Sequence, residues 1–238
     1  MHPHYVVPMF SPQWTLGIVL SVLLFYSMIR IGRYALSKGF EMKYRYFLVG
    51  IFIIRECYLF AYIFQEGMFT IQDSLPLHLC GISYIFMIIF LLKPNYLLFE
   101  FLLLLSLGGA IQSFVTPELT HGYSLYFIID FYFSHAAIIF GSMYGLFVFN
   151  MRPLRLAWLR IWICAHLVLG SVYLINLVLD SNYIYLMRAP EAQNPMILRP
   201  YPMHLIGFEI FGTLHILLFY WLSGYVLPKP FAVMQKTL

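Results

Sequence analysis

Residues 96–115 read YLLFEFLLLLSLGGAIQSFV, a run of twenty residues in which Glu100 is the one charged side chain. A helix of about 20 apolar residues crosses the hydrocarbon core of a bilayer, which is roughly 30 Å thick. Similar runs recur along the chain, so the sequence predicts an all-α polytopic membrane protein. Seven transmembrane helices are expected, near residues 11–30, 46–65, 75–92, 96–115, 124–149, 157–179 and 204–226.

The composition of the whole chain favours the same fold class. Of its 238 residues, 62% are hydrophobic and only 10% are charged. A soluble domain carries about 25% charged residues, and the strands of an outer-membrane barrel alternate polar and apolar positions. The low charge therefore excludes an ordinary cytosolic enzyme, a disordered tail and a nucleic-acid-binding module. We expect a single seven-helix membrane domain over residues 1–238.

The basic residues predict the orientation of these spans. Most of them fall on one side of the membrane, namely Arg30, Arg33, Lys38, Lys43, Arg45, Lys93, Arg152, Arg155, Arg160, Lys229 and Lys236. The opposite side carries only Arg188 and Arg199, in a proline-rich loop, while Arg55 lies inside a span. Because Lys and Arg collect in cytoplasmic loops, the N-terminus is expected outside and the C-terminus in the cytoplasm.

Several ionisable or nucleophilic side chains fall inside the predicted spans. Each charge costs at least about 2.5–3.5 kcal/mol at the centre of a helix, so each calls for a reason. Most lie in the outer half of the membrane: Arg55, Glu56, His78, Cys80, Asp130, His135, Glu209 and His215. This clustering predicts a shared cavity open to the outer leaflet or the external face. Glu100 and Arg160, near span ends, are expected to reach the surface.

A cysteine and a histidine in one cavity indicate nucleophilic chemistry. An imidazole can convert a thiol to a thiolate, which is the logic of acyl transfer through cysteine. His78 is two residues from Cys80 and faces another side of the helix, so His135 is expected as the base for Cys80. Four spans begin outside and favour a phosphate or oxyanion there. Arg188 and Arg199 are suited to hold a lipid headgroup.

Two other interpretations fit the same residues. The polar side chains can line the pocket of a non-enzymatic heptahelical protein that binds or transports a lipid or small molecule. His78, His135 and His215, with Asp130 or Glu209, can also hold a zinc ion that activates water in an intramembrane hydrolase. No H-x-x-x-H pair occurs, so every ligand would come from a separate helix. We predict no metal and no cofactor.

Four short motifs carry a resemblance to a known membrane family. They are L-P-L-H-L-C at 75–80, F-Y-F-S-H at 131–135, N-Y-I-Y-L at 182–186 and P-Y-P-M-H-L at 200–205. In order and spacing they resemble the bacterial YwaF-like integral membrane family, which is similar to the eukaryotic transmembrane protein 164 group. The resemblance implies a protein of the bacterial cytoplasmic membrane whose relatives are acyltransferases that remodel ether phospholipids with a Cys and a His. Androgen-induced-type hydrolases of fatty acid esters are similar more distantly.

Carried over residue by residue, the resemblance makes His135 the catalytic histidine. The eukaryotic motif reads P-C-H, which puts Leu77 of this chain at the position of the nucleophile. Cys80 lies three residues further on, on nearly the same face of a helix and one turn deeper. The resemblance therefore implies a phospholipid acyltransferase or lipid ester hydrolase, with membrane lipids as partners, and leaves open whether Cys80 is the nucleophile.

Overall fold

A computed structural model of the chain describes residues 4–190, 198 and 201–226, and most of these residues are helical. The helices are α1 (Pro12–Ser37), α2 (Glu41–Gln65), α3 (Leu79–Leu92), α4 (Tyr96–Phe101), α5 (Leu107–Val115), α6 (Leu125–Phe147), α7 (Ala157–Leu179) and α8 (Met203–Trp221). The π-helical turn η1 (Leu102–Ser106) joins α4 to α5, η3 (Leu222–Val226) follows α8, and η2 (Tyr183–Tyr185) is a short 3-10 helix. Two short strands, β1 (Tyr5–Val6) and β2 (Glu118–Leu119), pair antiparallel.

Six helical segments are long and apolar enough to cross a membrane: α1, α2, α4 with η1 and α5, α6, α7, and α8 through Gly224. The prediction of a helical integral membrane protein is confirmed by these segments. The remaining apolar helix, α3, has 14 residues and is about 21 Å long at 1.5 Å per residue. The span expected at 75–92 is thus helical only from Leu79, because the chain makes a tight turn around Pro76, in which the Leu77 N–H donates to the Leu75 carbonyl at 2.7 Å.

The helix ends follow from local sequence. Ser11, Asn95 and Ser124 precede α1, α4 and α6, and each side chain accepts the N–H of the residue three positions later, at 3.2, 2.9 and 3.0 Å. Such caps satisfy backbone donors that have no partner inside the helix. After α1 and α2 the chain turns at Gly39 and Gly67, with φ of +77° and +66°, a conformation that glycine adopts without steric cost.

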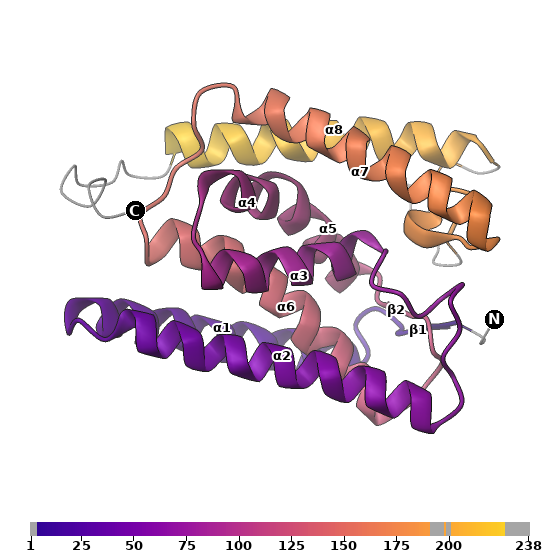
Figure 1. Cartoon of the computed structure of the whole chain (residues 1–238), viewed down its shortest axis with the longest axis horizontal. Coiled ribbons are helices and arrows are strands. Elements are labelled where there is room, and N and C mark those ends of the chain that lie inside the picture. Colours follow the sequence, from indigo (N-terminus) through magenta and orange to yellow (C-terminus); the bar gives the residue numbers. More distant parts are fainter. Residues whose placement is uncertain (1–3, 191–197, 199–200, 227–238) are drawn as a thin grey trace.

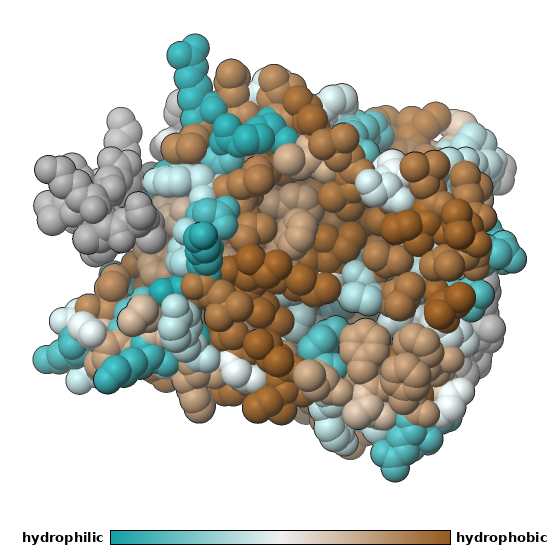
Figure 2. All heavy atoms as spheres, in the orientation of Figure 1, coloured by the Kyte–Doolittle hydropathy of each residue, from teal (hydrophilic) through white to brown (hydrophobic). Residues whose placement is uncertain are grey.

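The helices form three layers, which Figure 1 shows. The pair α1 and α2 lies on one side, the pair α7 and α8 on the other, and α3, α4, α5 and α6 lie between them. Helix α6 is central because it packs against α1, α3 and α5. The outer pairs expose many large apolar side chains, such as Leu20, Ile54 and Val178. Figure 2 shows a largely hydrophobic face, as expected of a surface in contact with lipid.

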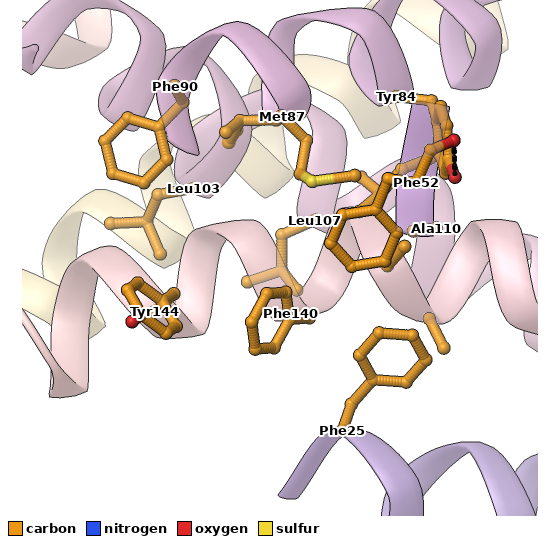
Figure 3. Close-up of a cluster of buried hydrophobic side chains, with 14 of the residues drawn as sticks. Phe25, Phe52, Tyr84, Met87, Phe90, Leu103, Leu107, Ala110, Phe140 and Tyr144 are labelled. Carbon is orange, nitrogen blue, oxygen red and sulfur yellow. Dashed lines mark hydrogen bonds between the residues drawn. The ribbon is translucent and has the colours of Figure 1, made fainter. Parts of the chain in front are cut away.

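Aromatic side chains fill the core where α1, α2, α3 and α6 meet (Figure 3). The rings of Phe25, Phe52 and Phe140 lie 5.5 to 6.4 Å apart between centroids. Tyr84 of α3 packs edge-on against Phe52 and donates its hydroxyl to the Phe52 carbonyl at 3.1 Å. Tilted and edge-to-face aromatic pairs stabilise a core beyond the area they bury, so this cluster joins four helices firmly.

A buried polar group lies where α2 begins. Arg45 donates to Glu41 Oε1 at 3.0 Å and to the carbonyl of Leu91 near the end of α3, and Tyr144 donates to the same carboxylate at 2.9 Å. The span expected at residues 46–65 leaves Arg45 just outside the membrane, but it lies inside α2 and is buried. The last carbonyls of a helix lack partners within it and favour a cation, which explains this placement.

The position of Glu100 also differs from the expectation. The expectation that it reaches the membrane surface is wrong, since its side chain is fully buried between α4 and α7. Its carboxylate accepts hydrogen bonds from Arg160 Nη2 at 2.5 Å and from the Leu154 N–H at 2.8 Å. These charged hydrogen bonds replace the water that Glu100 was expected to reach.

Candidate functional site

A cavity of about 700 Å³ lies among α2, α3, α5, α6, α7 and α8 and the loops that precede α3, α6 and α8. This volume falls within the range of pockets that bind small ligands, roughly 300–1,000 Å³. Most of its wall is apolar, with leucine and phenylalanine side chains from several helices. Figure 2 shows the surface hollowed near the middle of the face, where hydrophilic residues interrupt the hydrophobic ones. The cavity is suited to an apolar ligand that carries a few polar groups.

Eight of the ten site residues named from the sequence border this cavity. They are Arg55, Glu56, His78, Cys80, Asp130, His135, Glu209 and His215. Arg188 is exposed on the loop after α7 and is not among the lining residues, and Arg199 lies outside the described residues. Side chains that are far apart in the sequence thus meet at one void.

Cys80 is the second residue of α3, and its thiol borders the cavity. Its Sγ lies 3.8 Å from the hydroxyl oxygen of Ser113 on α5. The Ser113 hydroxyl in turn donates to the Gly109 carbonyl at 3.0 Å, so its oxygen is left to accept the thiol hydrogen. The expected contact between Cys80 and His135 is not formed, because the thiol is turned toward α5.

His135 lies in the middle of α6. Its Nδ1 is 2.8 Å from the carbonyl of Phe131, one turn earlier. A carbonyl only accepts, so Nδ1 carries the hydrogen and Nε2 holds the lone pair of the neutral ring. No hydrogen bond to Nε2 is formed within the described part of the chain. The ring therefore presents a basic nitrogen at a wall of the cavity.

His215 on α8 repeats this arrangement. Its Nδ1 lies 2.6 Å from the carbonyl of Phe211, again one turn earlier, and its Nε2 makes no hydrogen bond to any described residue. The ring packs on α5 at Gly108, where an added Cβ would lie 2.8 Å from the imidazole Cδ2. Glycine at this position makes room for the imidazole.

Arg55 on α2 binds Asp130 on α6 through two parallel hydrogen bonds, Nε to Oδ1 at 2.6 Å and Nη2 to Oδ2. Its Nη1 also donates to Glu56 Oε2 at 2.6 Å, and the guanidinium lies 4.9 Å from the centroid of the Tyr84 ring. Bidentate pairing of this kind fixes orientation as well as charge, so the group holds α2 against α6.

Glu209 lies apart from that group, at the wall formed by α7 and α8. Its Oε1 accepts hydrogen bonds from Trp162 Nε1 and Thr213 Oγ1, each at 3.1 Å, and its Oε2 lies 3.1 Å from His166 Nε2. The side chains of Glu209 and His166 are 44% and 41% exposed. The acids of the predicted cluster therefore occupy two separate walls of the cavity.

His78 lies at the end of the cavity that the loops before α3 and after α7 form. Its Nδ1 accepts the Ile184 N–H at 3.2 Å, and its ring lies 5.3 Å from both Tyr183 and Tyr185. The Tyr183 hydroxyl accepts the Leu75 N–H at 3.0 Å, and burial raises the pKa of Tyr183. His78 and the N-Y-I-Y-L motif thus tie the loop after α7 to the turn before α3.

The first turn of α3 has three backbone N–H groups that the helix itself leaves without a partner. They belong to Leu79, Cys80 and Gly81, all of which line the cavity, and none has a hydrogen-bond partner among the described residues. A helix N-terminus carries about half a positive charge. The thiol of Cys80 therefore lies next to donors that suit a negatively charged oxygen.

The sequence of the chain matches the model of a known family. The model described as the TMEM164 family matches residues 4–220. The chain belongs to the TMEM164 family. No curated protein and no solved structure matches it. The matched residues include all the residues that line the cavity of this TMEM164-family protein.

Sequence reasoning missed a pair of residues in the loops of this TMEM164-family protein. Ser74 and His121 both border the cavity, and the Ser74 oxygen lies 3.4 Å from His121 Nε2. The Ser74 oxygen also accepts the Thr70 N–H at 3.1 Å, as in a hydroxyl-capped turn. The residues are 47 positions apart and outside the spans, so no periodic signal connects them.

The histidines do not gather around a common point. Among the described residues of this TMEM164-family protein, no three His, Cys, Asp or Glu side chains lie close enough to hold a metal ion. His78 binds the loop after α7, while His135 and His215 lie on separate helices. The structure thus offers no ligand set for the zinc hypothesis within that part of the chain.

Gly81 is required where the turn before α3 passes over the helix. An added Cβ would lie 2.9 Å from backbone atoms of Pro76, which have no side-chain freedom to move away. We expect Gly81→Ala to lower the free energy of unfolding by about 1–3 kcal/mol. Gly50→Ala is the matched control, because a Cβ there meets nothing within 4 Å. Equal unfolding midpoints for the two variants in detergent would contradict this role.

Proposed function

We propose that this TMEM164-family protein is an intramembrane enzyme that transfers acyl chains of lipid esters, with Cys80 as nucleophile and His135 as general base. One observation carries the proposal: Cys80, with its thiol, and His135, whose imidazole Nε2 makes no hydrogen bond to any described residue, border the same largely apolar cavity. The apolar wall suits acyl chains, and the two polar groups suit an ester. The resemblance of the motifs around Cys80 and His135 to lipid acyltransferases supports the same assignment.

In the acylation step, the Cys80 thiol gives its proton to His135 Nε2, and the sulfur attacks the carbonyl carbon of the ester. The thiol must first leave Ser113, to which it is now turned. In this proposal the short Cys80 side chain rotates away from Ser113 when lipid is bound. Hydrogen bonds between catalytic groups commonly tighten only when substrate is bound.

The tetrahedral intermediate then needs donors for its oxyanion. In this proposal the N–H groups of Cys80 and Gly81 supply them, since both belong to the first turn of α3, which carries the thiol. Preorganised donors of this kind are often the largest contribution to such catalysis. When the carbon–oxygen bond of the ester breaks, the His135 imidazolium returns its proton to the leaving alkoxide, and an acyl thioester remains on Cys80.

The remaining predicted residues receive supporting roles in this proposal. Arg55, Glu56 and Asp130 fix α2 against α6, which carries His135, and Glu209 closes the wall between α7 and α8. Arg188 and Arg199, on the loop between α7 and α8, would hold the anionic headgroup of the phospholipid. The Asn182 side chain already anchors the Arg188 backbone, accepting its N–H at 2.9 Å and donating to its carbonyl at 3.1 Å.

The proposal includes a topology. The chain would form one domain that crosses the bacterial cytoplasmic membrane seven times, with α3 as the short seventh span and the N-terminus outside. Because α3 packs between α2 and α6, its own length need not match the bilayer. The start of α3, with Cys80, would then face the outer leaflet, which contains phospholipid esters.

Substitution of Cys80 tests the proposal. Purified protein in phospholipid vesicles with a labelled acyl chain should move the label to added lysophospholipid or release it as fatty acid. We expect Cys80→Ala to lower this rate to the background of protein-free vesicles. Cys57→Ala is the matched control, because Cys57 is exposed on α2 away from the cavity, and it should keep the wild-type rate.

The outcomes separate the alternatives. Full activity in Cys80→Ala would show that the thiol takes no part in the mechanism, while the protein would still be an enzyme. Saturable binding of lipid by the wild type without any transfer or release of label would contradict the enzyme and favour a binding protein. Activity lost equally in Cys57→Ala would show that the cysteines act through the fold.

A further inference from the structure

Three helical histidines at the cavity wall, His135, His166 and His215, direct Nδ1 at the carbonyl one turn earlier, and in His166 the Nε2 lies 3.1 Å from Glu209 Oε2. In His135 and in His215 the Nδ1–H donates to the carbonyl one turn earlier, at 2.8 and 2.6 Å. In both, the basic Nε2 has no partner among the described residues. The acylation step proposed above uses only one such nitrogen. The second one, on α8, is therefore without a role.

A packing role alone does not explain His215. Its neighbours on the cavity wall of α8 are Phe211, Gly212 and Ile216, none of which has a polar side chain. The other polar side chains of that wall, Glu209 and Thr213, bond to each other and to α7. His215 Nε2 is not among the fully buried polar atoms of the described residues, so it is open to a hydrogen-bond donor that a ligand in the cavity would bring.

The position of His215 relative to Cys80 is set by α5. His215 packs on Gly108, and the neighbouring Gly109 carbonyl accepts the hydroxyl of Ser113, which is the partner of the Cys80 thiol. The side chain of Leu79 lies 3.6 Å from where a Cβ of Gly109 would be. The part of α5 between Gly108 and Ser113 thus packs against the start of α3 and also against His215.

We propose that His215 is a second catalytic base, which activates the hydroxyl of an acceptor lipid in the step that unloads Cys80. This inference rests on the proposed function. The acceptor O–H gives its proton to His215 Nε2 while its oxygen attacks the thioester carbonyl. The carbon–sulfur bond then breaks, the imidazolium returns the proton to the Cys80 sulfur, and the acyl chain leaves as a new ester. No oxidant, reductant or metal takes part in this step.

The two histidines then act in different halves of the reaction, and single-turnover measurements separate them. Protein in vesicles is loaded with a labelled ester lipid and then mixed with lysophosphatidylcholine, and the thioester on Cys80 is followed by intact-protein mass spectrometry. We expect His215→Gln to form the thioester as the wild type does and to unload it about a hundredfold more slowly or worse. His135→Gln, in contrast, should not form the thioester.

A second variant guards against a defect of folding. His215→Ala leaves a space beside Gly108, and added imidazole should restore unloading if a base is what was lost. Unloading at the wild-type rate in His215→Gln would overturn the inference while leaving the acyl enzyme intact. Failure of His215→Gln to form the thioester would overturn it as well, since the residue would then act before the unloading step. Absence of thioester and product in the wild type would overturn the proposed function itself.

Discussion

We expect His135→Gln to lower acyl transfer by about 10²–10⁴-fold, which is the usual contribution of a positioned general acid or base. The glutamine amide does not titrate near neutral pH and takes no proton from the Cys80 thiol. Its NH₂ group can still donate to the Phe131 carbonyl, which now accepts from the imidazole Nδ1 at 2.8 Å. The variant should therefore fold and bind lipid as the wild type does, while it reacts slowly.

Two measurements on one sample separate the loss of a base from the loss of the fold. They are the initial rate of labelled acyl transfer in vesicles and the unfolding midpoint. A midpoint near that of the wild type, with a rate near background, is the predicted pair of results. Transfer at the wild-type rate by His135→Gln would remove this residue from the mechanism.

The second large effect is expected in stability, at Arg55. The side chains of Arg55 and Asp130 are only 15% and 11% exposed, so their pair is largely shielded from water. Removing one partner of a buried ion pair costs about 3–5 kcal/mol, because the other charge is left uncompensated. Arg55→Leu leaves two carboxylates, those of Asp130 and Glu56, without their cation. We expect it to lower the free energy of unfolding by that amount.

Two further variants control this prediction. Arg33→Leu makes the same exchange at an exposed position of α1 and should change the free energy of unfolding by less than about 0.5 kcal/mol. Adding Asp130→Leu to Arg55→Leu removes one of the stranded carboxylates and should recover part of the loss. Unfolding by denaturant in detergent micelles measures all three. Equal losses for Arg55→Leu and Arg33→Leu would show that the ion pair contributes nothing.

The helices were predictable because lipid allows few alternatives. A run of about twenty apolar residues has to be helical to satisfy its backbone, so α4 with α5 and also α7 begin and end where the sequence analysis placed them. The turn before α3 was missed, since a close approach of Gly81 to Pro76 depends on atoms that are not neighbours on any helix face. The length of α3 follows from that contact.

The charged residues show where sequence reasoning ends. The position of each residue along its helix can be counted from the sequence, so the placement of Arg55, Asp130 and His135 around one cavity could be predicted. The partner of a charge is a matter of tertiary packing. Glu100 was expected at the surface, yet Arg160 and the Leu154 N–H meet it in the interior. Arg45 likewise donates a hydrogen bond to a carbonyl at the end of α3 and does not extend into solvent.

Most residues of the candidate site could be predicted from the sequence, but the contacts between them could not. Helical periodicity places Cys80 on the cavity side of α3, but it does not say which way the thiol turns. The partner is Ser113, which lies 33 residues away on α5. The matching orientation of His135 and His215 could not be foreseen either, because it depends on side-chain rotation toward a carbonyl of the same helix.

The central claim is that Cys80 carries the acyl chain, and one measurement tests it directly. Wild-type protein is mixed with an ester lipid in the absence of any acceptor, the reaction is quenched early, and the acyl group is located by mass spectrometry of peptides. The account predicts an acyl thioester on Cys80. Transfer of acyl chains with no adduct on Cys80, or with the adduct on another residue such as Ser74, would contradict it.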